Sequence, residues 1–270
     1  AIANEFDTKI YAANTNTFGR YENETVFPDP ASVKLIILIL DIKDSYGKDG
    51  NKGFVVGYFD PGDLTNSHYS NKAPILYIDA NPNDINSELT YSTIAHEFQH
   101  LINYCTTVER RKYTMDTWID EGLSCAAEYI YYGEIDTSRN SRLDRFNKDP
   151  LGTIARGNNF FIWGEDREEG SDTTLDDYAT AYLFFLWLDI QGNREIYRDI
   201  AQSTKYDHEA VTEAAVKRFG GGDAASFKDW DVLLGTWLKA NYIGSDSGRE
   251  GYGNKIHPRV WAVPGGEYEL

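Results

Sequence analysis

Apolar residues change their spacing about one third of the way along the chain, which predicts two kinds of structure. Before residue 87, β-branched and aromatic residues gather in short runs separated by polar, glycine-rich loops, as is typical of strands. The predicted strands are residues 33–42, 54–59 and 75–79. The first is apolar at nearly every position, so we expect it to be buried on both faces. The first thirty residues are polar and rich in asparagine, and we expect strands or an extended arm there.

From residue 87 onward, apolar residues recur every three or four positions, which predicts helices. Ser87 can cap the first helix, which should end near Tyr104. The other predicted helices are 117–132, with Trp118, Leu123, Ala126 and Ile130 facing inward, and then 176–190, 193–201, 208–219 and 226–240, after a loop-rich stretch at 139–172. Strands followed by helices predict an α+β fold. We expect an N-terminal subdomain over 1–107, with a mixed sheet, and a mainly helical C-terminal subdomain over 108–270, together forming one domain.

The first predicted helix carries the pattern His96-Glu97-Phe98-Gln99-His100 at its centre. Residues four apart lie on the same helix face, so both imidazoles can bind one metal ion. Glu97 stands beside the first histidine, where its carboxylate can take a proton from a water on that ion. Two of the chain's five histidines are used in this pattern. The helix therefore predicts a zinc site that performs hydrolysis.

A catalytic zinc needs a third protein ligand, with a fourth position left open for water. Glu121 on the second predicted helix is the candidate, because a reversal between the two helices can return its carboxylate to the imidazoles. Asp120 and Glu128 are alternatives. The side chain of Asp120 points about 100° away from that of Glu121 around the axis of the same helix. Glu128 lies two turns further on, which suits a hydrogen bond to the N–H of a ligand histidine better than ligation.

Two segments resemble the gluzincin metallopeptidases, in which two histidines and a downstream glutamate bind zinc. They are Thr93-Ile-Ala-His-Glu-Phe-Gln-His-Leu-Ile102 and Trp118-Ile-Asp-Glu-Gly-Leu-Ser124. More narrowly, Gly57-Tyr-Phe-Asp60 and Leu76-Tyr-Ile-Asp79 are similar to the hyicolysin-type peptidases, and this resemblance extends over residues 33–135.

The resemblance implies a zincin-like fold with one catalytic zinc on His96, His100 and Glu121, and with Glu97 as the general base. The Trp-x-x-Glu-Gly pattern is also similar to the aminopeptidase branch of the gluzincins. The chain lacks the Gly-x-Met-Glu-Asn element of that branch, since its only methionine is Met115. This departure favours an endopeptidase over an exopeptidase.

Such a peptidase also needs a donor for the oxyanion that develops on the scissile carbonyl. Tyr178-Ala-Thr-Ala-Tyr182 is similar to the Tyr-x-x-Gly-Ala start of the corresponding aminopeptidase helix, which implies Tyr178 as the donor. Tyr182, the loop around Trp163 and His208 are alternatives. In zincins the strand before the active-site helix lies at the sheet edge and pairs antiparallel with the substrate. The resemblance implies this place for residues 75–80, and the alternative is an ordinary inner strand.

Charge and composition narrow the class of partner. The 43 acidic and 26 basic residues give a formal charge of −17, which argues against a nucleic-acid partner. No apolar run is long enough to span a bilayer. The start of the chain lacks a signal-peptide pattern, and the composition is typical of a secreted bacterial hydrolase. We expect an extracellular protein that acts on protein or peptide substrates, and the sequence leaves its oligomeric state open.

The remaining candidate ligands carry weaker signals. Acidic clusters could hold structural calcium, but none has an EF-hand spacing, and solvated loops are the simpler reading. The clusters are Asp41, Asp44 and Asp49, then Asp60 and Asp63, then residues 166–177. His68, His208 and His257 have no partner spacing, and we expect them to be structural. Cys105 and Cys125 lie near the metal ligands of the two helices, so we expect a close pair, with the disulfide left open.

Two further functions fit the same motif. One is a zincin-fold binding module that keeps the metal but has lost turnover, although the intact Glu97 argues against it. The other is a non-proteolytic hydrolase that uses the same site. We predict a zinc-dependent endopeptidase that hydrolyses peptide bonds in extended polypeptides by metal-activated water.

Overall fold

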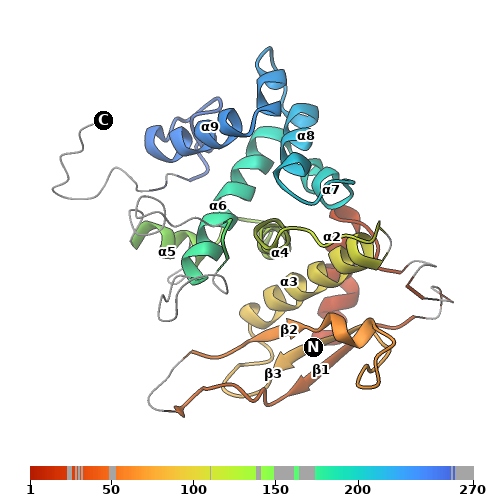
Figure 1. The fold of residues 1–270 in the computed structure, drawn as a ribbon. Coiled ribbons are helices and arrows are strands. Elements are labelled where there is room, and N and C mark those ends of the chain that lie inside the picture. Colours follow the sequence, from red (N-terminus) through yellow and green to blue (C-terminus); the bar gives the residue numbers. More distant parts are fainter. Residues whose placement is uncertain are drawn as a thin grey trace. The chain divides into compact units, whose positions relative to one another are not determined.

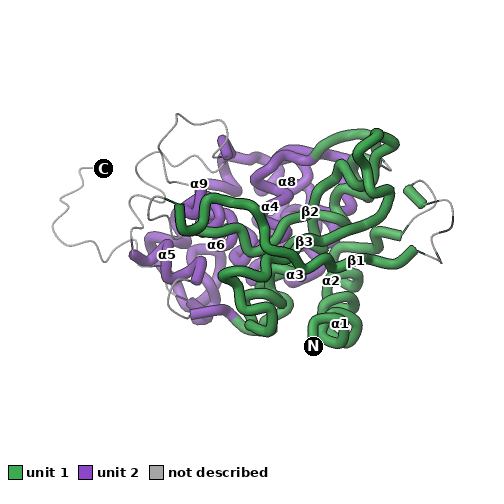
Figure 2. The backbone as a smooth tube through the Cα atoms, turned by 90° about the horizontal axis from the view of Figure 1, so that it is seen from below, with its two compact units in different colours: residues 1–114, 127–134 green, residues 115–126, 135–270 purple. Residues whose placement is uncertain are grey.

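The computed structural model describes most of the chain, namely residues 1–22, 26–27, 29, 31, 33–48, 53–109, 111–137, 141–148, 161–163, 174–256 and 258. It is an α+β structure with a small mixed sheet and many helices, which confirms the predicted class (Figure 1). The chain divides into two compact units (Figure 2). Unit 1 contains residues 1–114 and 127–134, and unit 2 contains residues 115–126 and 135–270. Helix α4 (Thr117–Tyr132) contributes residues to both units.

Unit 1 begins with a helical stretch, so the prediction of strands or an extended arm was wrong. The stretch consists of α1 (Ile2–Glu5), a π-helical turn (Phe6–Ile10) and α2 (Tyr11–Thr17). Its buried face is half polar, since Phe6 and Ile10 are followed by the buried side chains of Asn14 and Thr17. A polar residue at an inward position hides the helical repeat from a pattern that counts only apolar residues.

The sheet of unit 1 has the strand order β1-β3-β2. Strand β1 (Ile36–Leu40) runs parallel to β3 (Ile75–Asp79), and β2 (Gly57–Phe59) runs antiparallel to it. The predicted third strand has the observed bounds. Its predicted place at the sheet edge was wrong, because β1 and β2 pair with its two sides.

Strand β1 is an edge strand, which overturns the prediction that it is buried on both faces. Ile36, Leu38 and Ile39 are 44%, 41% and 41% exposed. An apolar run does not show whether other elements cover the faces of a strand, and within the described residues β1 pairs with β3 alone.

Helix α3 (Glu88–Tyr104) follows β3 and has the predicted bounds. Ser87 caps it, since the Ser87 side chain accepts a hydrogen bond from the Thr90 backbone N–H at 3.2 Å. Its buried aromatic residue Phe98 lies 5.0 Å from the Phe6 ring, measured between ring centroids. Its last residue, Tyr104, lies 5.9 Å from Phe59 of β2 in the same measure. The helix is therefore packed on one side by the N-terminal helices and on another by the sheet. A π-helical turn at Cys105–Glu109 follows it, and a 3₁₀ turn at Pro61–Leu64 follows β2.

Unit 2 is helical in the part that the structure describes. Its elements after the first half of α4 are α5 (Arg142–Lys148), α6 (Thr174–Gly192), α7 (Glu195–Ala201), α8 (His208–Arg218), a 3₁₀ turn (Ala224–Lys228) and α9 (Trp230–Ile243). Trp118 of α4 and Trp230 of α9 have ring centroids 5.6 Å apart in its aromatic core. The predicted helices are present, except that 226–240 begins as a 3₁₀ turn and α5 interrupts the predicted loop. None of the described helices is long and apolar enough to cross a membrane.

Gly122 of α4 has no room for a side chain. A Cβ there would lie 2.2 Å from Phe185 Cε2 of α6, whose ring is fully buried. Gly122→Ala should therefore lower the free energy of unfolding by about 1–3 kcal/mol, despite the better helix propensity of alanine. Gly235→Ala in α9 is the matched control, because a Cβ there meets nothing within 4 Å, and it should stabilise by up to about 1 kcal/mol. Urea unfolding measures both, and equal effects at the two positions would contradict this packing.

Candidate metal centre

Helix α3 places the two motif histidines one turn apart on the same face. The ring centroids of His96 and His100 are 4.8 Å apart. His96 and the neighbouring Glu97 are buried, with exposed fractions of 5% and 8%. The pattern read from the sequence therefore brings two imidazoles together beside a carboxylate that is largely withdrawn from solvent.

Helix α4 presents a row of potential ligands at the spacing i, i+4, i+7, namely Glu121, Cys125 and Glu128. This spacing puts all three side chains on one helix face. Glu128 belongs to unit 1 with His96, and its Oε1 lies 2.7 Å from His96 Nδ1. A hydrogen bond at Nδ1 leaves Nε2 as the ring nitrogen available to a metal. The preference for Glu128 as the partner of a ligand histidine, rather than as a ligand, agrees with this contact.

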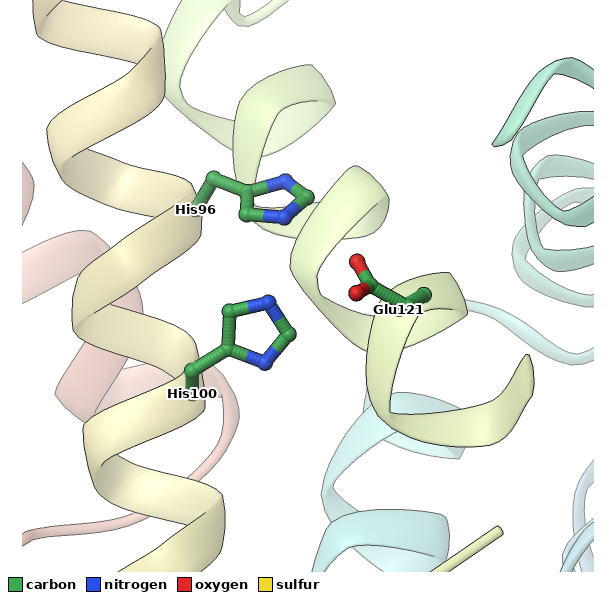
Figure 3. Close-up of side chains that lie close together, drawn as sticks. All are labelled: His96, His100 and Glu121. Atoms are coloured by element: carbon green, nitrogen blue, oxygen red, sulfur yellow. The ribbon is translucent and has the colours of Figure 1, made fainter. Parts of the chain in front are cut away.

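Glu121 lies two turns before Glu128 on the same continuous helix, so both side chains lie on one face of α4. The Glu128–His96 hydrogen bond shows that this face is turned toward His96. Its carboxylate points toward both imidazoles (Figure 3). One ligand atom from each of His96, His100 and Glu121 lies within 4.8 Å of the others. Asp120, the neighbouring alternative, belongs to no such group in the described part of the chain.

The donor set fits a catalytic zinc ion. Two imidazole nitrogens and one carboxylate oxygen are a set found in zinc hydrolases, and they leave one position open. The three donor atoms lie within 4.8 Å of one another, which is close enough for one ion to bind all three. The net ligand charge of −1 also suits a divalent cation that keeps a water.

A second group of possible ligands shares His96. Atoms of His96, Cys125 and Glu128 also lie within 4.8 Å of one another. The sequence alone indicated Cys125 only as a possible disulfide partner. The spacing of Glu121, Cys125 and Glu128 is a signal that could have identified Cys125 as a possible metal ligand. Cys105 and Cys125 are both buried, and neither forms a disulfide.

Tyr178, predicted as the oxyanion donor, lies in the first turns of α6. Its ring packs against Trp163, with centroids 5.1 Å apart, and under the Arg142 guanidinium at 4.5 Å. Its backbone carbonyl accepts a long hydrogen bond from Cys125 Sγ at 4.0 Å, one turn from Glu121 on α4. Tyr182, the alternative donor, is only 4% exposed, whereas Tyr178 is partly exposed.

The acidic residues considered for calcium are used within the fold where the structure describes them. Asp63 is 3% exposed and accepts a hydrogen bond of 2.6 Å from the Tyr77 hydroxyl. The Asp44 carboxylate accepts hydrogen bonds from the backbone N–H groups of Tyr46 and Val55. These bonds hold the pKa of Asp44 below its ordinary value.

Other weak candidates contact aromatic rings or lie outside the described residues. His68 contacts Tyr69, and His208 contacts Trp230, with ring centroids 5.1 and 5.5 Å apart. The predicted candidates Asp49 and His257, and residues 166–173, lie outside the described residues.

Glu128→Gln should weaken zinc binding by about 10–100-fold, because a neutral amide holds the His96 N–H less firmly than a carboxylate does. Competition with a chromophoric chelator measures the affinity. Asp120→Asn is the matched control on the same helix and should change the affinity little. An unchanged affinity in Glu128→Gln would mean that the 2.7 Å contact does not orient His96 for a metal.

Comparison with known proteins agrees with these motifs. No family model matches the chain. The chain is 31% identical over 230 residues to the protein named Neutral metalloprotease ShpI of Staphylococcus hyicus, a hyicolysin. The match covers 80% of this chain and 48% of the relative, so the chain spans about half the relative's length. This similarity confirms the resemblance to the hyicolysin-type metallopeptidases that the sequence motifs indicate.

Proposed function

We propose that the protein is a zinc-dependent endopeptidase that cleaves protein or peptide substrates. The convergence of His96, His100 and Glu121 on one point carries this proposal, because it supplies an open hydrolytic zinc site next to Glu97. The similarity to a metalloprotease supports it. The composition, with many Tyr, Asn, Asp and Gly and one Met, favours an extracellular place of action.

Each residue of the site has a separate task in this proposal. His96, His100 and Glu121 would hold the zinc, and Glu128 would keep the His96 ring in the ligating orientation. Bound zinc supplies Lewis acidity, which polarises the scissile carbonyl and makes water more acidic. The Glu97 carboxylate accepts the proton of the attacking water and passes it to the leaving amine. Its burial beside the two imidazoles favours turnover over a binding module that has lost activity.

Strand β2 replaces residues 75–80 as the strand proposed to pair with an extended substrate. It is an edge strand, and it runs antiparallel to β3. It also lies against α3, since a Cβ on Gly57 would be 3.0 Å from Thr93 Cγ2, three residues before His96. A peptide added along β2 would therefore run beside the helix that carries the two imidazoles.

Tyr178→Phe should lower kcat by about 10²–10³-fold while KM and zinc content barely change, because a hydroxyl that binds the oxyanion acts mainly in the transition state. The contact of its backbone with Cys125 and its partial exposure support this role. Tyr182→Phe is the matched control, and it should lower kcat only slightly, through its effect on packing. The opposite ranking would make Tyr182 the donor, and two mild effects would place the donor elsewhere.

Metal content and chelator sensitivity test the proposed function together. Mass spectrometry should find one zinc per chain, and casein cleavage should stop with phenanthroline and return when zinc is restored. Cleavage that persists after complete metal removal would refute a metallopeptidase. A stoichiometric zinc without cleavage of any polypeptide would favour the binding module or a non-proteolytic hydrolase.

A further inference from the structure

Cys125 stands between two residues that serve the candidate zinc site, four positions after Glu121 and three before Glu128. It is fully buried, and its thiol lies within 4.8 Å of ligand atoms of both His96 and Glu128. The Glu128–His96 bond occupies Nδ1 of the imidazole. The Glu128 carboxylate therefore lies on the Nδ1 side of the His96 ring, and the Cys125 thiol lies within 4.8 Å of a ligand atom of each of these two residues.

The chemistry of this group differs from that of the zinc site. A thiolate is the preferred ligand of soft metal ions, whereas two imidazoles and a carboxylate suit borderline ions such as zinc. One thiolate and one carboxylate also balance the charge of a divalent cation when the imidazole is neutral. Charge balance matters here because His96 is only 5% exposed and Cys125 is not exposed at all, and an unbalanced charge is costly to bury.

We propose that His96 Nδ1, Cys125 Sγ and a Glu128 carboxylate oxygen form a second metal site, which takes soft divalent cations such as cadmium and excludes the catalytic zinc. The exclusion follows from the proton balance of the shared ring. Binding replaces the thiol proton of Cys125, which leaves to solvent, and it replaces the proton of His96 Nδ1. A neutral imidazole then carries its proton on Nε2, so this nitrogen cannot ligate the catalytic zinc.

Occupation of the second site would also break the Glu128–His96 hydrogen bond that orients the ring. A soft cation at this point should therefore weaken zinc binding and stop peptide hydrolysis without touching Glu97 or His100. The inhibitory part of this proposal rests on the proposed peptidase function, whereas the binding part does not.

Cadmium titration of the purified protein tests the site, with thiolate-to-cadmium charge-transfer absorption in the ultraviolet as a readout that does not need activity. The wild-type protein should develop this band to the amplitude of one thiolate and should lose zinc as it does so. Cys125→Ala should lose the band. Cys105→Ala is the matched control, since Cys105 is the other buried cysteine, and it should keep the band.

Cys125→Ser provides a second variant that fills the same space without a soft ligand, so the test does not depend on one protein folding. Peptidase inhibition is measured relative to the zinc-loaded activity of each variant, and both Cys125 variants should need at least tenfold more cadmium than wild type. A band retained in both Cys125 variants, or absent from wild type, would overturn the site. A band with no peptidase activity in any form would leave the metal site supported and refute the peptidase instead.

Discussion

Glu97→Ala should keep one zinc per chain and the folded structure, while turnover of a peptide substrate falls by about 10²–10⁴-fold. Proton transfer by a positioned carboxylate contributes this much to a hydrolytic step. Glu97 stands next to His96 on α3 and is 8% exposed, so bulk water cannot readily take its place. Because the residue is not a zinc ligand in this proposal, metal content and activity should separate.

Glu88→Ala is the matched control, since Glu88 is the acidic residue in the first turn of the same helix. It should leave kcat within a few-fold of wild type. Glu97→Gln adds a variant of nearly the same shape that cannot accept the proton, and it should be as inactive as Glu97→Ala. Near-normal turnover in a zinc-loaded Glu97 variant would show that another group is the base.

His100→Ala should abolish stoichiometric zinc binding and, with it, peptidase activity. Removing one of three protein ligands should cost more affinity than the roughly 10–100-fold expected for the outer partner Glu128. Glu121→Ala should act in the same direction. If its zinc affinity is unchanged, the third ligand is Asp120 or Glu128, and a full zinc complement in His100→Ala would refute the site.

Folding stability gives an independent measure of the loss of zinc binding in His100→Ala. Zinc that binds only the folded state raises the free energy of unfolding by about 2.7 kcal/mol when its concentration is 100 times the dissociation constant. Chelator should therefore lower the melting temperature of the wild type but not that of His100→Ala. His68→Ala is the matched control, because His68 contacts the Tyr69 ring in unit 1 and should leave the chelator effect intact.

Helices α3 and α4 could be predicted from the sequence because their signals are local. The Ser87 cap and the three- and four-residue apolar spacing act within a few turns of the chain, and they set the observed bounds of α3. The pairing of His96 with His100 is equally local, since helix geometry alone brings residues four apart together.

The sequence did not predict features that depend on distant neighbours. The apolar run of β1 does not show whether one strand or two lie beside it, and β3 is internal only because β2 pairs with its other side. The N-terminal helices bury Asn14, whose amide donates a 2.7 Å hydrogen bond to the carbonyl of Ala95 on α3. A buried polar residue with a partner 81 positions away leaves no periodic signal in its own segment.

The sequence by itself determined the chemistry available at the site, namely two imidazoles and an adjacent carboxylate on one helix. The tertiary structure decided which residues of α4 meet them. Helix spacing allows Glu121, Cys125 and Glu128 to share a face, but only packing of α4 against α3 turns that face toward His96. The physical reason is range: capping and helix periodicity act over a few residues, whereas ligand convergence depends on how separately formed helices pack.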